Sequence, residues 1–225
     1  LETTRQAAAA GKHGFLDKPI ANTLAEGRAN TQGCAQAGVV LALGYQRRRE
    51  SQFRWIRKQI DEGVFGRLVN AEANISRDRL GKIDLNSWRY QAAGMPGGVM
   101  LQIGVHYVDV LEYLMGPVKS VSGNLAQLVL PGDNPDVASL LLEHENGALS
   151  TINASYASAA ENYVMNIYGK EATAFYDMHR GLRFVKRRTE KAVSVPCAKN
   201  DTLFAPLEEF AAAVRGQGVT EHEVP

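Results

Sequence analysis

The chain has 225 residues, and its content of 45% hydrophobic and 22% charged residues is that of a globular protein with a sizeable core. The net charge of +1 excludes an overall electrostatic attraction to nucleic acid or to an anionic membrane, so we expect neither as a partner. The two cysteines, Cys34 and Cys197, lack the spacing of a metal site and indicate a reducing, cytoplasmic location. No apolar run approaches the roughly 20 residues of a membrane helix.

Residues 1–48 are predicted to form the end of a parallel α/β sheet. Thr23 and Glu26 form a capping box, which indicates the start of a helix, and Pro19 stops the strand before it. The expected elements are a helix up to residue 11, a strand over 13–16, a helix over 24–37 and a strand over 39–45. Their order predicts a parallel βαβ unit, the last one of a doubly wound sheet.

From residue 49 onward the pattern is that of an α+β domain. The expected elements are a helix over 50–63, a strand over 67–76, a polar loop over 77–96 and a helix over 98–115. A broad antiparallel sheet is predicted from the apolar runs that follow, at 118–129, 136–145, 148–157, 162–169, 172–178, 182–187 and 192–196. The last helix, over 202–214, is expected to face inward with Phe204, Leu207, Phe210 and Val214.

Some of these strands carry apolar residues on both faces, as in SLLLEHE (139–145) and NYVMNIYG (162–169). One layer of helices cannot cover two apolar faces of a sheet. We therefore expect the open face to pack against another subunit in a homo-oligomer, a dimer or a tetramer.

The helix over 98–115 carries a polar trio inside an apolar run. Gln102, His106 and Asp109 fall at i, i+4 and i+7, so their side chains share one face of a regular helix. A histidine titrates near neutrality and can take a proton from a hydroxyl. A buried histidine whose ring nitrogens are satisfied by Gln102 and Asp109 explains the same spacing. The trio alone leaves both interpretations open.

Lys18 favours the catalytic interpretation. It lies at the carboxyl end of the first predicted strand, directly before Pro19, and open α/β sheets bind ligands outside the carboxyl ends of their strands. An ammonium beside a histidine suits the oxidation of a hydroxyl, because the cation stabilises the developing alkoxide while the histidine removes the proton. We expect Lys18 and His106 to point into one cleft between the two domains.

The sequence resembles the Gfo/Idh/MocA oxidoreductases over two stretches, GKHGFLDKPIANTLAEGRANTQGCAQAGVVLALGYQRRR (11–49) and GGVMLQIGVHYVDVLEYLMG (97–116). The resemblance implies that 1–48 is the C-terminal remnant of a dinucleotide-binding Rossmann domain. It implies that 49–225 is a substrate-binding and oligomerisation domain of α+β type with a large open antiparallel sheet. The implied activity is that of an NAD- or NADP-dependent dehydrogenase, without a metal ion, acting on a sugar, cyclitol or related polyhydroxy substrate.

The resemblance also assigns roles by position. Lys18 and Pro19 match the Lys-Pro pair beside the nicotinamide, Lys18 also lies near the substrate hydroxyl in such enzymes, and His106 matches the catalytic base. Substrate-binding roles are implied for Arg48, Gln102, Asp109, Trp88, Arg89 and Tyr156, with Tyr45 and Gln46 as further pocket candidates. Packing in the core or on the sheet is the alternative for Trp88 and Tyr156.

Two positions depart from the family pattern. Asp17 stands where a glutamate is usual, which keeps the charge. Gln102 stands where an aspartate is usual, and a neutral amide cannot raise the basicity of a histidine as a carboxylate does. The amide still hydrogen-bonds to a hydroxyl, so the change indicates an altered choice of substrate.

The glycine-rich fingerprint of a dinucleotide site does not occur in the sequence. Because the family carries it near the N-terminus, we expect the chain to be truncated before the fifth Rossmann strand. Two functions remain. The first is the dehydrogenase that transfers a hydride between a nicotinamide and its substrate, and the alternative is a non-catalytic family member that acts as a ligand sensor or assembly module.

Overall fold

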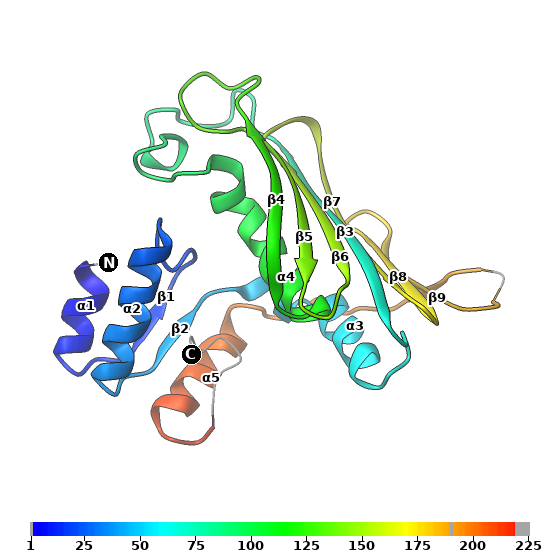
Figure 1. Cartoon of the computed structure of the whole chain (residues 1–225), viewed down its shortest axis with the longest axis horizontal. Helices are drawn as coiled ribbons and strands as arrows, with labels where there is room; N and C mark the ends of the chain where they lie inside the picture. Colours follow the sequence, from blue (N-terminus) through cyan, green and yellow to red (C-terminus); the bar gives the residue numbers. More distant parts are fainter. Residues whose placement is uncertain (1, 190, 219–225) are drawn as a thin grey trace. The chain divides into compact units, whose positions relative to one another are not determined.

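The computed structural model in Figure 1 describes residues 2–189 and 191–218. The chain divides into two compact units, one of residues 1–46 and 200–225 and one of residues 47–199. Each unit has its own sheet and its own buried hydrophobic cluster. The first boundary lies close to the one expected after residue 48, whereas the C-terminal segment clusters with the first unit instead of the second. The roles of the units in nucleotide and substrate binding stay predictions.

The first unit contains the predicted parallel βαβ arrangement. It runs through α1 (Glu2–Ala9), β1 (Gly14–Leu16), α2 (Leu24–Gln36) and β2 (Leu41–Leu43), and the two strands pair in parallel. The Thr23 hydroxyl accepts a hydrogen bond of 3.2 Å from the backbone N–H of Glu26, as the capping box predicts. Ala8, Cys34 and Leu41 form the buried cluster between these elements.

The last helix, α5 (Phe204–Val214), also belongs to the first unit. Its Phe210 ring lies edge-on to Phe15 of β1, with 5.7 Å between the ring centroids. The predicted inward stripe is wrong for Phe204, Leu207 and Val214, which are 58%, 47% and 36% exposed. A helical stripe is buried only where a neighbouring element covers it, and a two-stranded sheet is too narrow to cover this one.

The second unit is built on an eight-stranded sheet in the order β10-β9-β8-β7-β3-β6-β5-β4. Its strands are β3 (Leu68–Asp78), β4 (Val118–Ala126), β5 (Val137–His144), β6 (Leu149–Ser155), β7 (Ala157–Gly169), β8 (Ala172–Asp177), β9 (Gly181–Lys186) and β10 (Val193–Val195). All neighbours are antiparallel except β3 and β6, which are parallel. The predicted fold class is confirmed, with one correction. β3 inserts between β6 and β7, a non-local pairing that alternation along one strand does not specify.

Helices cover one face of this sheet, while the opposite face is open. The helical segments of the second unit are the 3-10 helices η1 (Gln46–Arg49, which begins at the unit boundary) and η2 (Trp88–Tyr90), α3 (Ser51–Asp61), the π-helical turn η3 (Met100–Gly104) and α4 (Val105–Met115). Ala71, Ala73 and Ile75 of β3 face the helical layer and are buried. Leu141 and Leu149 lie on the open face and are 42% and 46% exposed. None of the described helices has the length and apolarity needed to cross a membrane.

A buried carboxylate organises the loop that precedes β5. Asp136 is 1% exposed and accepts hydrogen bonds from the backbone N–H groups of Leu128, Val129 and Leu130, at 2.9, 2.8 and 2.6 Å. A carboxylate that accepts several backbone N–H bonds satisfies donors that would otherwise be buried without an acceptor. The loop conformation therefore depends on this one side chain.

We predict that Asp136→Ala destabilises the second unit by at least about 3 kcal/mol, because it leaves three backbone donors without their acceptor. Urea denaturation measures the loss. The control is Asp133→Ala, in the same loop, which removes one exposed hydrogen bond to the backbone of Ala92 and is expected to cost less than about 1 kcal/mol. Equal losses for the two variants would contradict the role of Asp136.

Candidate functional site

Lys18 lies where β1 ends, as predicted. The strand ends at Leu16, the Lys18–Pro19 peptide bond is cis, and the Asp17 carboxylate accepts a hydrogen bond of 2.9 Å from the backbone N–H of Lys18. The Lys18 side chain is half-buried. The lysine is therefore part of an ordered turn at the carboxyl end of a parallel strand.

A cavity of about 370 Å³ opens at the same ends of β1 and β2. Its lining residues from the strand ends are Phe15, Asp17, Gly44 and Gln46, and those from the α5 region are Thr202, Leu203, Pro206 and Leu207. Apolar walls with a few polar groups suit a flat ring that carries an amide. The residues present therefore fit the nicotinamide end of a dinucleotide.

Gln102 bridges two segments of the second unit. The Tyr156 hydroxyl donates a hydrogen bond to Gln102 Oε1, and Gln102 Nε2 donates one of 3.3 Å to the backbone carbonyl of Arg89. Burial raises the pKa of Tyr156, so its hydroxyl stays protonated and remains a donor. The structure thus brings Gln102 together with Tyr156 and with the backbone of Arg89, while their predicted contact with a substrate stays a prediction.

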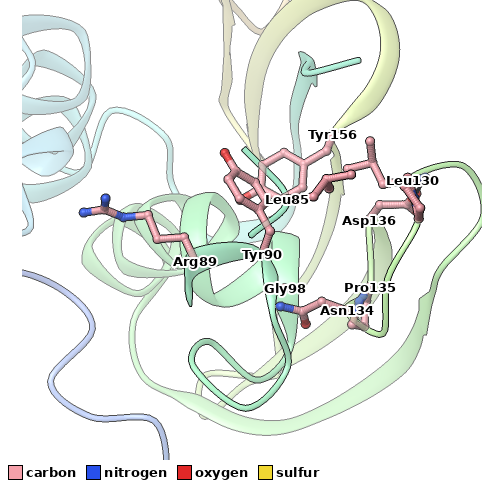
Figure 2. Close-up of a pocket in the computed structure, with 10 residues that line it drawn as sticks. Leu85, Arg89, Tyr90, Gly98, Leu130, Asn134, Pro135, Asp136 and Tyr156 are labelled. Carbon is pink, nitrogen blue, oxygen red and sulfur yellow. Dashed lines mark hydrogen bonds between the residues drawn. The ribbon is translucent and has the colours of Figure 1, made fainter. Parts of the chain in front are cut away.

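Figure 2 shows a small recess beside this bridge, lined by Leu85, Arg89, Tyr90, Gly98, Leu130, Asn134, Pro135, Asp136 and Tyr156. The rings of Tyr90 and Tyr156 meet edge-on at 5.8 Å, and the Arg89 side chain extends away from them. Its guanidinium stacks on Trp88, with Cζ 5.0 Å from the ring centroid. Trp88 is 53% exposed, so the alternative of core packing is wrong for Trp88, whereas Tyr156 is part of the core.

Arg48 and Asp109 also come together. The Arg48 guanidinium binds the Asp109 carboxylate through two nitrogens, with Nε 3.0 Å from Oδ2. The Asp109 side chain is 7% exposed, so the pair is nearly desolvated and holds η1 against α4. Their predicted contact with a substrate stays a prediction.

His106 lies in the first turn of α4, between Gln102 and Asp109, and is half-buried. Gln102 belongs to the π-helical turn and binds Tyr156, while Asp109 binds Arg48. The expectation that His106 and Lys18 face one cleft concerns both units together and stays a prediction, as do the positions of Tyr45 and Gln46 relative to a substrate.

The sequence interpretation missed a set of residues that we name the arginine–tyrosine cluster, namely Arg47, Arg77, Arg79, Tyr107 and Tyr163. Arg47, Arg77, Tyr107 and Tyr163 contact one another beside the sheet, where the Arg47 guanidinium carbon lies 5.0 Å from the Tyr163 ring centroid. Arg79 joins the cluster because its charge acts on Tyr163. β3 continues to Asp78, so Arg77 belongs to a strand and not to the predicted polar loop. No local pattern indicates the cluster, because the register of β3 against β7 shifts between Ser76 and Asp78 and the tyrosines lie far along the sequence.

Known proteins resemble this chain in sequence and in fold. A solved structure of a candidate NADPH-dependent oxidoreductase from Desulfitobacterium hafniense superposes with a TM-score of 0.90 and 29% identity, over 98% of this chain and 68% of that one. Residues 53–175, more than half of the chain, match the model of the GFO/IDH/MocA C-terminal domain. The chain belongs to the Gfo/Idh/MocA family.

Two curated relatives give this family membership more detail. Levoglucosan dehydrogenase of Pseudarthrobacter phenanthrenivorans is 26% identical over an alignment of 202 residues, gaps included, that covers 77% of this chain and 51% of that protein. The scyllo-inositol 2-dehydrogenase (NAD(+)) of Bacillus subtilis is 27% identical over 177 residues, 76% of this chain and 49% of that protein. The chain spans about half the length of these curated relatives.

We predict that Arg48→Met costs about 3–5 kcal/mol of unfolding free energy, because it leaves the buried Asp109 carboxylate without its counter-charge. Urea denaturation measures this loss, and the double variant R48M/D109L is expected to recover part of it. The control is Lys58→Met, which breaks an exposed ion pair with Glu62 and is expected to cost less than about 1 kcal/mol. A loss in R48M no larger than that of the control would contradict the prediction.

Proposed function

We propose that this chain is part of an NAD- or NADP-dependent oxidoreductase that transfers a hydride between the nicotinamide and a CH–OH carbon of a sugar, cyclitol or related polyhydroxy substrate. The observation that carries the proposal is the retention of two reactive side chains in a chain of this family. Lys18 stands before Pro19 at the carboxyl end of β1, and His106 stands in α4.

The roles of these side chains follow from their chemistry. A bound nicotinamide supplies the hydride-accepting ring. The His106 imidazole takes the hydroxyl proton of the substrate. The Lys18 ammonium stabilises the negative charge that develops on the same oxygen. The half-buried setting of both side chains strengthens these interactions, because the local dielectric is lower than that of water.

The relatives support the same substrate class and cofactor. One is named a levoglucosan dehydrogenase and another an NAD(+)-dependent scyllo-inositol 2-dehydrogenase, so the names cover an anhydrosugar and a cyclitol. The cavity at the ends of β1 and β2 supports a nicotinamide beside Lys18.

We predict that His106→Ala in the full-length protein lowers turnover by roughly 10²–10⁴, the usual size of a general-base contribution, and leaves nucleotide affinity nearly unchanged. Lys18→Ala is expected to impair both turnover and substrate affinity, because its charge acts on the bound hydroxyl and on the alkoxide. Steady-state kinetics on a panel of sugars and polyols with both nucleotides give the measurement.

The control for the lysine is Lys12→Ala, an exposed residue before the amino end of β1, which is expected to leave turnover unchanged. A parent protein that binds a ligand of the panel but turns none over would decide for the alternative, a ligand sensor or assembly module.

We also propose that the open face of the large sheet packs against a second copy of this chain. Leu141 and Leu149 are half-exposed on that face, and the amide oxygen of Asn74, on the same face further along β3, is buried without a hydrogen-bond partner among the described residues. A two-fold interface would cover both features, since such an interface uses the same patch on both subunits.

We predict that Leu149→Arg shifts the protein toward the monomer in sedimentation experiments at micromolar concentration, because two-fold symmetry places each new charge in the same desolvated interface. Leu24→Arg is the matched control, since Leu24 is 71% exposed at the start of α2 and lies outside the sheet. A monomeric parent protein, or an L149R protein as associated as the control, would count against this interface.

A further inference from the structure

The arginine–tyrosine cluster lies on the helix-covered side of the large sheet, at the end of β3. Arg77 lies at a shift of register between β3 and β7, two residues after Ile75, which is paired with Tyr163 of β7. The Arg77 guanidinium carbon lies 5.7 Å from the Tyr163 ring centroid. Arg79 follows directly, and its backbone N–H donates a hydrogen bond of 2.9 Å to the carbonyl of Tyr156.

The cluster holds more positive than negative charge. Arg47 Nη1 lies 3.0 Å from Glu50 Oε1, and Arg77 Nε lies 3.4 Å from Glu161 Oε1. Arg79 makes no ion pair within the part of the chain that the structure describes. Two carboxylates therefore face three guanidinium groups, and one positive charge remains without a counter-charge.

The cluster also holds more hydrogen-bond donors than acceptors. Tyr107 is fully buried and Tyr163 is 7% exposed, and neither hydroxyl has a hydrogen-bond partner among the described residues. Within the same described part of the chain, Arg79 Nε is also buried without a hydrogen-bond partner, and Arg77 Nε makes no hydrogen bond beside its 3.4 Å ion pair with Glu161. A buried polar group without a partner costs free energy, so this arrangement suits a ligand that brings acceptor oxygens and negative charge.

The cluster adjoins the proposed catalytic helix. The Tyr156 hydroxyl, which donates to Gln102, is buried, and the charges of Arg79 and Arg77 oppose the effect of burial on its pKa. Burial raises the pKa of Tyr163, and the same two positive charges lower it. Gln102 lies about one turn before His106 in the same helix. An anion held by Arg79 would therefore lie beside the residues that we propose to hold the reacting hydroxyl.

We propose that the substrate carries an anionic group, a carboxylate or a phosphate, which Arg79 and Arg77 bind with the hydroxyl of Tyr163. This inference rests on the proposed function, because it names the substrate class of the same site. A guanidinium presents two parallel N–H donors that match the oxygens of a carboxylate or phosphate. The class is that of sugar acids or sugar phosphates, in place of neutral polyols.

The first test compares binding of acidic and neutral ligands to the full-length protein by calorimetry. The probes are D-glucuronate and D-gluconate for the carboxylate, D-glucose 6-phosphate for the phosphate, and D-glucose as the neutral sugar. We expect the preferred acidic probe to bind about 10–100-fold more tightly than glucose, the size of a charge-assisted hydrogen-bond contribution. Salt is expected to weaken binding of the acid and not that of glucose. Comparison of the acids distinguishes carboxylate from phosphate.

The second test removes the charge. Arg79→Gln is expected to weaken binding of the preferred acid about 10–100-fold and to leave binding of glucose unchanged, while Arg79→Lys retains part of the affinity. Arg67→Gln is the matched control, because Arg67 is an exposed arginine directly before the opposite end of β3. Thermal unfolding verifies that each variant is folded, and the salt test on the parent protein does not depend on any variant.

The outcomes separate this inference from the proposed function. Turnover of neutral polyols, with acids bound no more tightly and R79Q equal to R67Q, would overturn the anionic substrate and leave the oxidoreductase intact. Binding of an acid that depends on Arg79, without turnover with either nucleotide, would support the anion site and contradict the oxidoreductase. Turnover of an acid that R79Q impairs through KM more than through kcat would support both.

Discussion

The position of the proposed catalytic helix depends on its close approach to the centre of the large sheet. Gly104 ends the π-helical turn, and a Cβ atom added there would lie 3.7 Å from the Cβ of Ala154 on β6 and still closer to Met100. Ala73 and Ala154 are both buried and small. Small residues on both surfaces let helix and sheet pack in direct contact. Gln102 lies two residues before Gly104 and His106 two residues after it. The contact of Gly104 with the sheet therefore holds both residues in place.

The identity of Gln102 follows from its two neighbours. The residue accepts from the Tyr156 hydroxyl and donates to the Arg89 carbonyl, and an amide can do both whereas an ionised carboxylate only accepts. A carboxylate at this position would retain the first bond and lose the second. The departure from the family's aspartate is therefore part of how this chain fixes η2.

The sequence predicted those features that depend on local patterns. The capping box at Thr23, the parallel βαβ unit and the helix that carries His106 all come from spacings of a few residues, and the site residues came from motifs of the same length. The insertion of β3 beside β6 could not be predicted, because the pairing joins segments far apart in sequence. Arg77 and Arg79 were interpreted as a solvated loop for the same reason, since nothing local indicates that Tyr156 and Tyr163 lie against them.

The arginine–tyrosine cluster gathers several buried polar atoms without hydrogen-bond partners among the described residues in one place. Other such atoms of the second unit, Asn74 Oδ1, Asn134 Oδ1 and Arg183 Nε, lie in separate segments. His144 shows the usual arrangement of a buried polar side chain, since its Nδ1 donates to the Gly116 carbonyl and its Nε2 accepts from the Ser150 hydroxyl. At the end of β3, unmatched donors and an unmatched charge gather in one place, next to the helix that carries His106. Proteins retain such local costs mainly at functional sites, where a ligand offsets them on binding. The location of this imbalance therefore argues for a ligand-binding role of the cluster, independently of the family to which the chain belongs.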